Sequence, residues 1–478
     1  MTNQIFRHQL IYKLFLIVAL QLTGTAAFSQ KTGTHNAIYS GIPWFDNSGK
    51  VVSAHAGSII KEKGKYYLFG EAHTDTSNAF AGFNCYSSED LYNWKFESIA
   101  LPVQPTGKLG PNRIGERAKV VKNQSTGEFI MYMHVDTLGY KDQFIGYATA
   151  KTISGPYSFQ GPLLFNDKPI RKWDMGVFQD KDDSVYLLIH GGEIYKLDNN
   201  YKSILSQANK AITTGFESPT MFRKNNVYYF IGSNLTSWER NDNYYYTATS
   251  INGPWTSRGL FAPEDKLTWN SQTTYVLPIE GSEDTTYLFM GDRWSFPMQA
   301  SAATYVWQPI KISGSDISIP QFQAGWQINT NTGLASTIKT DGHIINNTNN
   351  RIKYNGTWQH TQDGDSQPEN KSDAPNASFS INFNARRMGI YSQTGNNKGY
   401  ARIEIHDHKG RIIYNSIVDM YSKVPVSSLI FQTPWLPTGN YTLNVYNTGI
   451  RSNWSDKKKS QYGSTGNFIS LEKIVLQP

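Results

Sequence analysis

The sequence predicts an all-β protein in which a five-bladed β-propeller is followed by a β-sandwich of the jelly-roll type. A unit of short strand, polar turn and aromatic strand recurs five times, about every 45 to 60 residues, which is typical of propeller blades. Aromatic residues make up 14% of the 478 residues and suit half-buried strands, while helical periodicity is nearly absent. One blade cannot bury both of its faces, so the units are expected to stack around an axis.

The clearest unit lies between Phe216 and Gly232. Glu217 stands at the mouth of a short strand, a polar turn follows at residues 223–226, and an aromatic, β-branched strand completes the unit. The other four units open in the same way, each with a different polar residue. The first strands cover residues 54–57, 116–120, 173–178, 216–222 and 270–276, and the polar residues at their openings are His55, Glu116, Asp174, Glu217 and Gln272.

Residues 1–29 have the pattern of a secretory signal peptide. Basic residues precede the apolar stretch 14–22, and residues 27–29 (Ala-Phe-Ser) match the small–x–small cleavage pattern. The apolar stretch is too short to span a bilayer, and no later segment qualifies as a membrane span. We therefore expect a protein without a membrane span that is periplasmic or secreted.

Two domains are expected after the signal, a propeller at residues 30–336 and a sandwich at residues 337–478. An edge strand is expected at Ile42–Asp46, before the first blade. It is expected to close the ring against residues 303–310 or 325–328, because an unpaired sheet edge is unfavourable.

The last third of the chain favours a β-sandwich, interpreted as a candidate carbohydrate-binding domain. It follows an Asn- and Thr-rich stretch at residues 346–350, which we interpret as the linker. Tyr354, Trp358 and Trp435 form either a sugar platform or part of the packing. The sequence His406–Gly410 is interpreted as a hairpin turn rather than a metal site. Alternating strands are predicted at residues 377–383, 401–405, 441–445 and 468–475.

The charge of the chain does not indicate a nucleic-acid partner. The formal net charge is +7 and the isoelectric point is near 9.0, but Lys and Arg are scattered along the sequence. Lys457–Lys459 is the one tight basic run, and we interpret it as a solvated loop. A weak attraction to acidic polysaccharide stays open, and the oligomeric state is not predicted.

The five strand openings predict a catalytic centre. The first strand of each propeller blade lines the central channel, so the openings converge on one pocket. Glu116, Asp174 and Glu217 would place three carboxylates there, and neighbouring carboxylates push their pKa values apart. Glycoside hydrolysis uses such a pair, because one protonated carboxyl gives its proton to the leaving oxygen. The alternative is that these carboxylates only accept hydrogen bonds from turn amides.

Residues 40 to about 330 resemble a propeller of glycoside hydrolase family 43, and are most similar to its exo-β-1,3-galactanase branch. The C-terminal part resembles, more loosely, the galactose-binding-like jelly rolls that are often appended to such enzymes. The motifs that carry the family resemblance are Ala54-His55-Ala56-Gly57, Tyr66–Glu71, Glu116–Val120, Glu217-Ser218-Pro219, Thr236-Ser237-Trp238 with Asn241, Ser271–Thr274 and Gly291–Trp294.

The resemblance implies an exported, inverting hydrolase that releases galactose from β-1,3-galactan. It implies Glu217 as the general acid and Asp174 as the residue that orients it and tunes its pKa. Where the broader family has an aspartate base, this chain has His55, and the resemblance places Gln272 at the attacking water. Glu116 is the alternative base, because an amide oxygen is a very poor one.

The sugar itself is expected to contact Glu116 and four further residues. Carboxylates accept hydrogen bonds from galactose hydroxyls, and an aromatic side chain covers the apolar face of the ring. The four expected sugar-binding residues are Glu71, Tyr140, Thr236 and Trp238.

Two other functions stay open, an α-L-arabinofuranosidase on the same propeller and a non-catalytic carbohydrate-binding propeller that has lost its base. Either would have a polysaccharide or oligosaccharide as its partner. No cofactor is required and no metal ligand set is present, although His55 faces the channel and a structural calcium ion there stays open.

Overall fold

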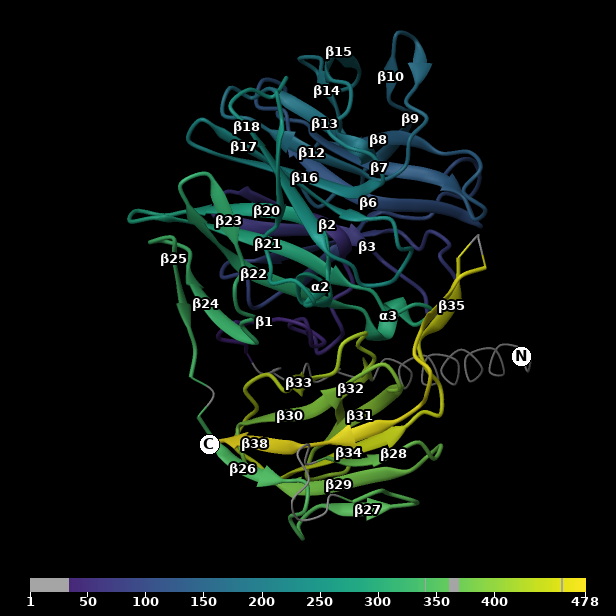
Figure 1. The fold of residues 1–478 in the computed structure, drawn as a ribbon, viewed down its shortest axis with the longest axis vertical. Helices are drawn as coiled ribbons and strands as arrows, with labels where there is room; N and C mark the ends of the chain where they lie inside the picture. Colours follow the sequence, from purple (N-terminus) through teal and green to yellow (C-terminus); the bar gives the residue numbers. More distant parts are fainter. Residues whose placement is uncertain (1–33, 340, 361–368, 457–458) are drawn as a thin grey trace, which may run out of the picture. The chain divides into compact units, whose positions relative to one another are not determined.

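Figure 1 shows the fold in a computed structural model, which describes residues 34–339, 341–360, 369–456 and 459–478. The candidate signal peptide at residues 1–29 lies outside these residues. Within them, the regular structure consists almost entirely of strands, and none of the helices is long and apolar enough to cross a membrane. The short helical turns are η1 (His190–Gly192), α2 (Leu267–Asn270) and α3 (Gln299–Ala302).

Five antiparallel sheets in the described chain each contain four strands that are consecutive in the sequence, which confirms the five-bladed propeller. Blade one contains β2 (His55–Glu62), β3 (Lys65–Glu71), β4 (Phe83–Ser88) and β5 (Lys95–Leu101). Blade two contains β6 (Arg113–Lys122), β7 (Phe129–Thr137), β8 (Phe144–Ala150) and β9 (Ser158–Pro162). Blade three contains β12 (Met175–Gln179), β13 (Val185–Ile189), β14 (Glu193–Leu197) and β15 (Ile204–Asn209). Blades four and five are β16 (Phe216–Lys224), β17 (Val227–Asn234), β18 (Asn243–Ala248), β19 (Thr256–Leu260); and β20 (Gln272–Glu280), β21 (Thr285–Arg293), β22 (Thr304–Ser313), β23 (Asp316–Ser318).

The first strands of the blades form a closed ring around the axis. Strand β6 contacts β2 and β12, β16 contacts β12 and β20, and β20 contacts β2. Each pair of adjacent blades encloses its own cluster of buried apolar side chains, as the aromatic and β-branched strands require. The cluster between blades five and one contains Trp94 and Trp307, and it closes the ring. A two-stranded hairpin, β10 (Leu164–Phe165) with β11 (Lys168–Pro169), follows blade two.

The ring is closed differently from the expectation. Residues 42–46 do not form a strand, and Phe45 makes only an isolated bridge to Val51. Pro43 has no N–H for a ladder, and the Trp44 indole folds back to donate a hydrogen bond of 2.6 Å to the Tyr39 carbonyl. The pairing strand is instead β1 (Ile38–Tyr39), which joins β24 (Gly325–Asn329), one of the two expected partners, and β25 (Leu334–Thr337). The other expected partner, residues 303–310, lies largely in β22 of blade five.

The C-terminal region is a β-sandwich around one apolar core. The change of domain falls between β25 and β26, so residues 346–350, expected to be the linker, lie inside the sandwich. One sheet contains β26 (His343–Asn346), β38 (Lys473–Gln477), β30 (Arg387–Thr394) and β33 (Val426–Gln432), and the other contains β27 (Lys353–Asn355), β29 (Ser378–Phe383), β34 (Tyr441–Asn447), β31 (Tyr400–His406) and β32 (Ile412–Asp419). Two small pairs are β28 (Asn370–Ser372) with β37 (Ile469–Leu471) and β35 (Asn453–Ser455) with β36 (Gln461–Gly463).

The aromatic residues of the sandwich serve packing rather than one platform. Tyr354 and Trp358 pack against the core, and each ring contacts Phe379. Trp435 lies apart from them, beneath the guanidinium of Arg387, 5.1 Å from its ring centre. The segment His406–Gly410 leads from β31 into β32, and the Gly410 N–H closes the predicted turn on the Asp407 carbonyl.

Candidate active site

A β-bulge follows the opening polar residue of three inner strands. The pairing register breaks after His55 in β2, after Glu116 in β6 and after Glu217 in β16. The residue that follows each of them has a positive φ: 48° at Ala56, 59° at Arg117 and 57° at Ser218. A bulge bends the strand and re-aims side chains, so two consecutive residues can face the channel where a regular strand would present one.

Arg117 joins the residues that the sequence placed on different blades. Its Nε lies 2.8 Å from Oδ1 of Asp174, and its Nη2 donates hydrogen bonds to Gln272 Oε1 at 2.9 Å and to Ser218 Oγ at 2.6 Å. Its backbone N–H donates to Glu71 Oε1 at 2.7 Å. Blades one to five therefore all contribute to one connected cluster.

Gln272 has a fully determined amide orientation. Its Oε1 accepts hydrogen bonds from Arg117 and from the indole N–H of Trp294, each at 2.9 Å, and both of these groups can only donate. Its Nε2 donates to Glu217 Oε1 at 3.0 Å and to Ser233 Oγ at 3.1 Å. Both acceptor sites of the amide oxygen are therefore filled by protein.

Asp174 and Glu217 have opposite electrostatic environments. Burial raises the pKa of Glu217, and the nearby charge of Asp174 raises it further, well above its ordinary value. Burial acts in the same direction on Asp174, but the Arg117 guanidinium outweighs it and holds the pKa of Asp174 below its usual range. The Ser218 N–H also donates to Asp174 Oδ2, at 2.9 Å. One carboxyl is thus kept protonated beside one that is kept ionised.

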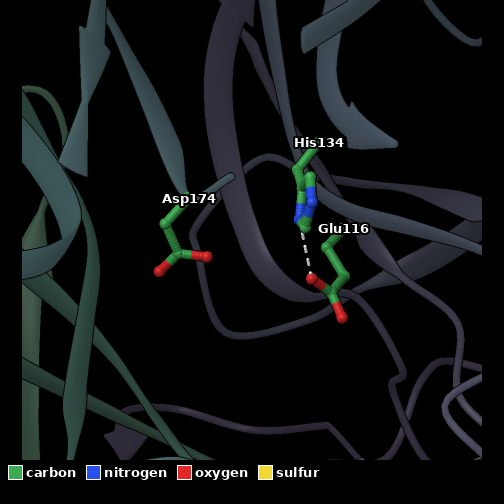
Figure 2. Close-up of side chains that lie close together, drawn as sticks. All are labelled: Glu116, His134 and Asp174. Carbon is green, nitrogen blue, oxygen red and sulfur yellow. Dashed lines mark hydrogen bonds and ion pairs between the residues drawn. The ribbon is translucent and has the colours of Figure 1, made fainter. Parts of the chain in front are cut away.

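Glu116 lies in a second, adjacent network. Figure 2 shows the contact between His134 and Glu116, in which Nδ1 lies 2.9 Å from Oε2, and the Tyr140 hydroxyl donates to Oε1 at 2.8 Å. The other ring nitrogen of His134 lies 3.5 Å from Asp136. Burial disfavours a charged ring, but the carboxylates of Asp136 and Glu116 outweigh it and raise the pKa of His134 to about 9. The ring is therefore an imidazolium that holds Glu116 in place.

Glu116, His134 and Asp174 each offer a ligand atom within 4.8 Å of the others, but they do not fit a metal ion (Figure 2). Asp174 is already paired with the Arg117 guanidinium, and His134 Nδ1 is already hydrogen-bonded to Glu116. Calcium prefers an all-oxygen ligand shell, which this group does not supply. His55 Nδ1 lies 3.0 Å from Asp292 and its ring stacks on Tyr305, and a structural calcium ion at His55 stays a prediction.

The expected sugar-binding residues differ in their surroundings. Glu71 is buried and lies 3.0 Å from His73 Nε2, and Tyr140 is tied to Glu116. Trp238 is half-buried and makes an edge contact with Trp294, whose indole reaches Gln272. The Thr236 hydroxyl, in contrast, donates to the Glu239 carbonyl within its own loop. Thr236 therefore shapes the loop that carries Trp238.

Sequence reasoning did not assign roles to Arg117, His134 or Asp136. Strand alternation places the residue after Glu116 on the opposite face, and only the bulge brings Arg117 inward. His134 pairs with Glu116 across the β6–β7 hairpin only because of the bulge. Regular pairing counted back from the turn at residues 123–128 would have set Arg117 opposite His134 instead.

Taken together, the cluster can protonate a leaving oxygen and hold a polar ring. Glu217 can supply the proton, because its pKa is raised beside Asp174, whose pKa is lowered, and Arg117 with Gln272 holds both side chains. Glu116 and Glu71 offer acceptors for hydroxyls, and Trp238 offers an aromatic face. This set of groups suits acid catalysis on a sugar acetal.

Comparisons with known proteins agree with this chemistry. The model of glycosyl hydrolases family 43 matches residues 50–259. An exo-β-1,3-galactanase from Phanerochaete chrysosporium, solved with β-1,3-galactotriose, is 25% identical with a TM-score of 0.69, covering 92% of this chain and 100% of that chain. A candidate exo-β-1,3-galactanase from Bifidobacterium bifidum is 36% identical with a TM-score of 0.55, covering 59% of this chain and 95% of that chain.

An exo-β-1,3-galactanase from Clostridium thermocellum shares the fold, with 23% identity and a TM-score of 0.59, covering 85% of this chain and 99% of that chain. No curated protein sequence matches the chain at a significant level.

Proposed function

This chain belongs to family 43 of the glycosyl hydrolases, and from that membership we propose that it is an exported, exo-acting enzyme that releases galactose from β-1,3-galactan, such as an arabinogalactan backbone. The observation that carries the proposal is the pair of opposed carboxyls, Glu217 protonated and Asp174 ionised, fixed by Arg117 and Gln272. The similar galactanase solved with β-1,3-galactotriose supports the choice of sugar.

We propose an inverting displacement. Glu217 gives its proton to the glycosidic oxygen as the bond from that oxygen to the anomeric carbon breaks. A water on the opposite face of the ring attacks the same carbon and loses one proton to a base. Asp174 stays ionised throughout, and its charge keeps the proton on Glu217 until the leaving oxygen takes it.

Glu116 is the base that the hydrogen bonds favour over Gln272. The Gln272 oxygen already accepts from Arg117 and Trp294, and an amide oxygen has two acceptor sites. The Glu116 carboxylate accepts from Tyr140 and His134, which leaves about half of its roughly four lone-pair sites for water. Gln272 then acts by holding the side chains of Glu217 and Arg117 in position through its hydrogen bonds.

The test is product analysis with the purified chain. We expect galactose alone to be released from β-1,3-galactan, and NMR to show it first as the α-anomer. The Glu217→Gln variant should lose about 10² to 10⁴-fold in kcat on the same substrate. Faster turnover of aryl α-L-arabinofuranosides than of galactan would show that the chain is an α-L-arabinofuranosidase. Binding without turnover in both wild type and variant would indicate a carbohydrate-binding propeller.

The sandwich has a groove that supports the expected carbohydrate-binding role. Its volume is about 780 Å³, and it lies over one end of β29, β34 and β31. The side chains that line it are mostly neutral hydrogen-bonding groups, which suit sugar hydroxyls. They include Asn382, Asn384, Asn440, Thr442 and Asn444. Titration of the Glu217→Gln variant with galactan oligosaccharides would test this carbohydrate-binding role. Adding Asn444→Ala to that variant should remove one of its binding sites.

A further inference from the structure

Three aromatic side chains form one side of the candidate active site, and we call them the aromatic wall: Trp238, Trp294 and Phe296. Trp238 is parallel to Phe296 at 6.0 Å and meets Trp294 edge-on at 5.1 Å between ring centres. Trp294 donates to Gln272, so the wall is continuous with the catalytic cluster. The wall lies on two loops, one after β17 and one after β21.

The loop that carries Trp238 is held by the sandwich. Glu239 follows Trp238 directly, and its Oε2 accepts a hydrogen bond of 2.7 Å from the hydroxyl of Tyr421. The next residue, Arg240, lies with Nη2 3.5 Å from Asp419 Oδ2 and with its guanidinium 4.7 Å from the Tyr421 ring centre. Asp419 ends β32, and its Oδ1 accepts from the Tyr421 N–H at 2.9 Å.

These groups are buried, so they depend strongly on one another. The side chains of Arg240 and Asp419 are 3% and 4% exposed. Two of the Arg240 nitrogens, Nε and Nη1, have no hydrogen-bond partner among the described residues. A buried charge that loses its partner is strongly destabilising, so the Trp238 loop is unfavourable in any position that separates Arg240 from Asp419.

The second loop of the wall is held in the same way. The Ser295 hydroxyl donates to Asp419 Oδ2 at 3.0 Å, and the Tyr400 hydroxyl donates to the Ser295 carbonyl at 3.0 Å. The Ser452 hydroxyl donates to the Phe296 carbonyl at 2.9 Å. Asp419 is therefore shared between both loops, and α3, which follows Phe296, contacts β32.

We propose that Asp419 and Tyr421 are positioning residues for the sugar-binding wall, so that the sandwich completes the active site of the propeller as well as any binding surface of its own. This inference rests on the proposed function, because Trp238 is expected to contact the sugar that the enzyme releases. Neither residue touches the reacting atoms. Their effect reaches the sugar through Glu239 and Arg240, which set the position of Trp238.

The test compares two matched variants of the full chain. Tyr421→Phe removes the hydroxyl that bonds Glu239, and Tyr354→Phe removes a similar hydroxyl, bonded to the Asn347 carbonyl at 2.8 Å inside the sandwich. Tyr421→Phe should raise KM for β-1,3-galactobiose about five- to tenfold with kcat changed less than about twofold, as expected for one buried hydrogen bond. Tyr354→Phe should leave both constants unchanged.

Two further measurements separate positioning from a general loss of structure. In a Trp238→Ala background, Tyr421→Phe should cause no additional rise in KM, because the side chain that it positions is absent. Amide hydrogen exchange should become faster at residues 235–242 in Tyr421→Phe and not in Tyr354→Phe. Unchanged exchange in Tyr421→Phe, or an equal rise in KM without Trp238, would overturn the inference. Absence of galactose release by the wild type would refute the proposed function, while the exchange result still decides the positioning.

Discussion

Arg117 shows how one side chain sets the protonation of two others. It lowers the pKa of Asp174 through a contact of 2.8 Å, and the ionised Asp174 in turn raises the pKa of Glu217. The same guanidinium binds the Gln272 oxygen, whose amide nitrogen reaches Glu217. A Lys at this position could supply the charge but not the planar arrangement of donors that contacts three partners.

The coupling of Asp174 to Glu217 predicts a pH shift. Catalysis needs Glu217 protonated, so kcat/KM falls as pH rises through its raised pKa. Asp174→Asn removes the negative charge that helps to raise this pKa, so the alkaline limb should move to lower pH. The measurement is kcat/KM for β-1,3-galactobiose against pH. Asp316→Asn, at an exposed carboxyl on β23, is the control and should leave the limb in place. An unmoved limb in Asp174→Asn would refute the coupling.

The choice of base predicts chemical rescue of one variant. Glu116→Ala should lose about 10² to 10⁴-fold in kcat, and azide should restore turnover with a galactosyl azide of inverted, α configuration as the product. Gln272→Ala should also lose activity, because it frees Glu217 and Arg117, but azide should not restore it. Rescue of Gln272→Ala in place of Glu116→Ala would assign the attacking water to Gln272.

At the scale of the element, the inner strands differ from regular strands at one point. The bulges at Ala56, Arg117 and Ser218 place non-glycine residues at positive φ, which costs about 1 to 2 kcal/mol each. Their contacts offset this cost, since the Ala56 N–H donates to Asp292 at 3.0 Å and the Lys119 ammonium binds the Ala56 carbonyl at 2.6 Å. The strain is located where the side chains must converge.

The bulge at Ala56 predicts that a larger, β-branched side chain at position 56 lowers the stability of the fold, independently of catalysis. Ala56 is fully buried, and a β-branched side chain is poorly tolerated at its φ of 48°. Ala56→Val should lower the free energy of unfolding by about 2 to 4 kcal/mol, measured by denaturant titration. Ala56→Gly, which accepts this φ freely, should stay within about 1 kcal/mol of wild type. Equal stability of the Val and Gly variants would show that the bulge is not strained.

The elements were more predictable from sequence than their connections. The polar opening, turn and aromatic run of each unit are local signals, and all five inner strands lie where they were predicted. The strand expected at residues 42–46 does not form, because Pro43 lacks an N–H and the Trp44 indole is hydrogen-bonded to the Tyr39 carbonyl. The alternation of residue types along the sequence does not reveal either effect. The convergence of Glu116, Asp174, Glu217 and Gln272 followed from blade position. The role of Arg117 did not, since it depends on a bulge that the sequence pattern does not reveal.

At the scale of the whole molecule, the sandwich and the propeller share a buried polar interface. Arg240, Asp419 and Tyr421 lie in it with little exposure to solvent. Buried polar groups of this kind favour one arrangement of two surfaces, because any other arrangement leaves a charge without its partner. The two domains should therefore behave as one unit in unfolding, although the sandwich and the propeller blades have separate apolar clusters.

This interface predicts a change in cooperativity. Wild type should unfold in urea in one transition, with tryptophan fluorescence and far-ultraviolet circular dichroism coinciding. In Asp419→Ala, Arg240 stays buried and keeps only the Glu239 carboxylate, 4.0 Å from its Nη1, as a partner. The loss of Asp419 should lower the stability of the interface by about 3 to 5 kcal/mol. The two signals should then separate into two transitions, one for each domain. Lys409→Ala, at an exposed position of the β31–β32 turn of the sandwich, is the control and should keep one transition. Two transitions already present in wild type, and unaltered by Asp419→Ala, would show that the domains are energetically independent.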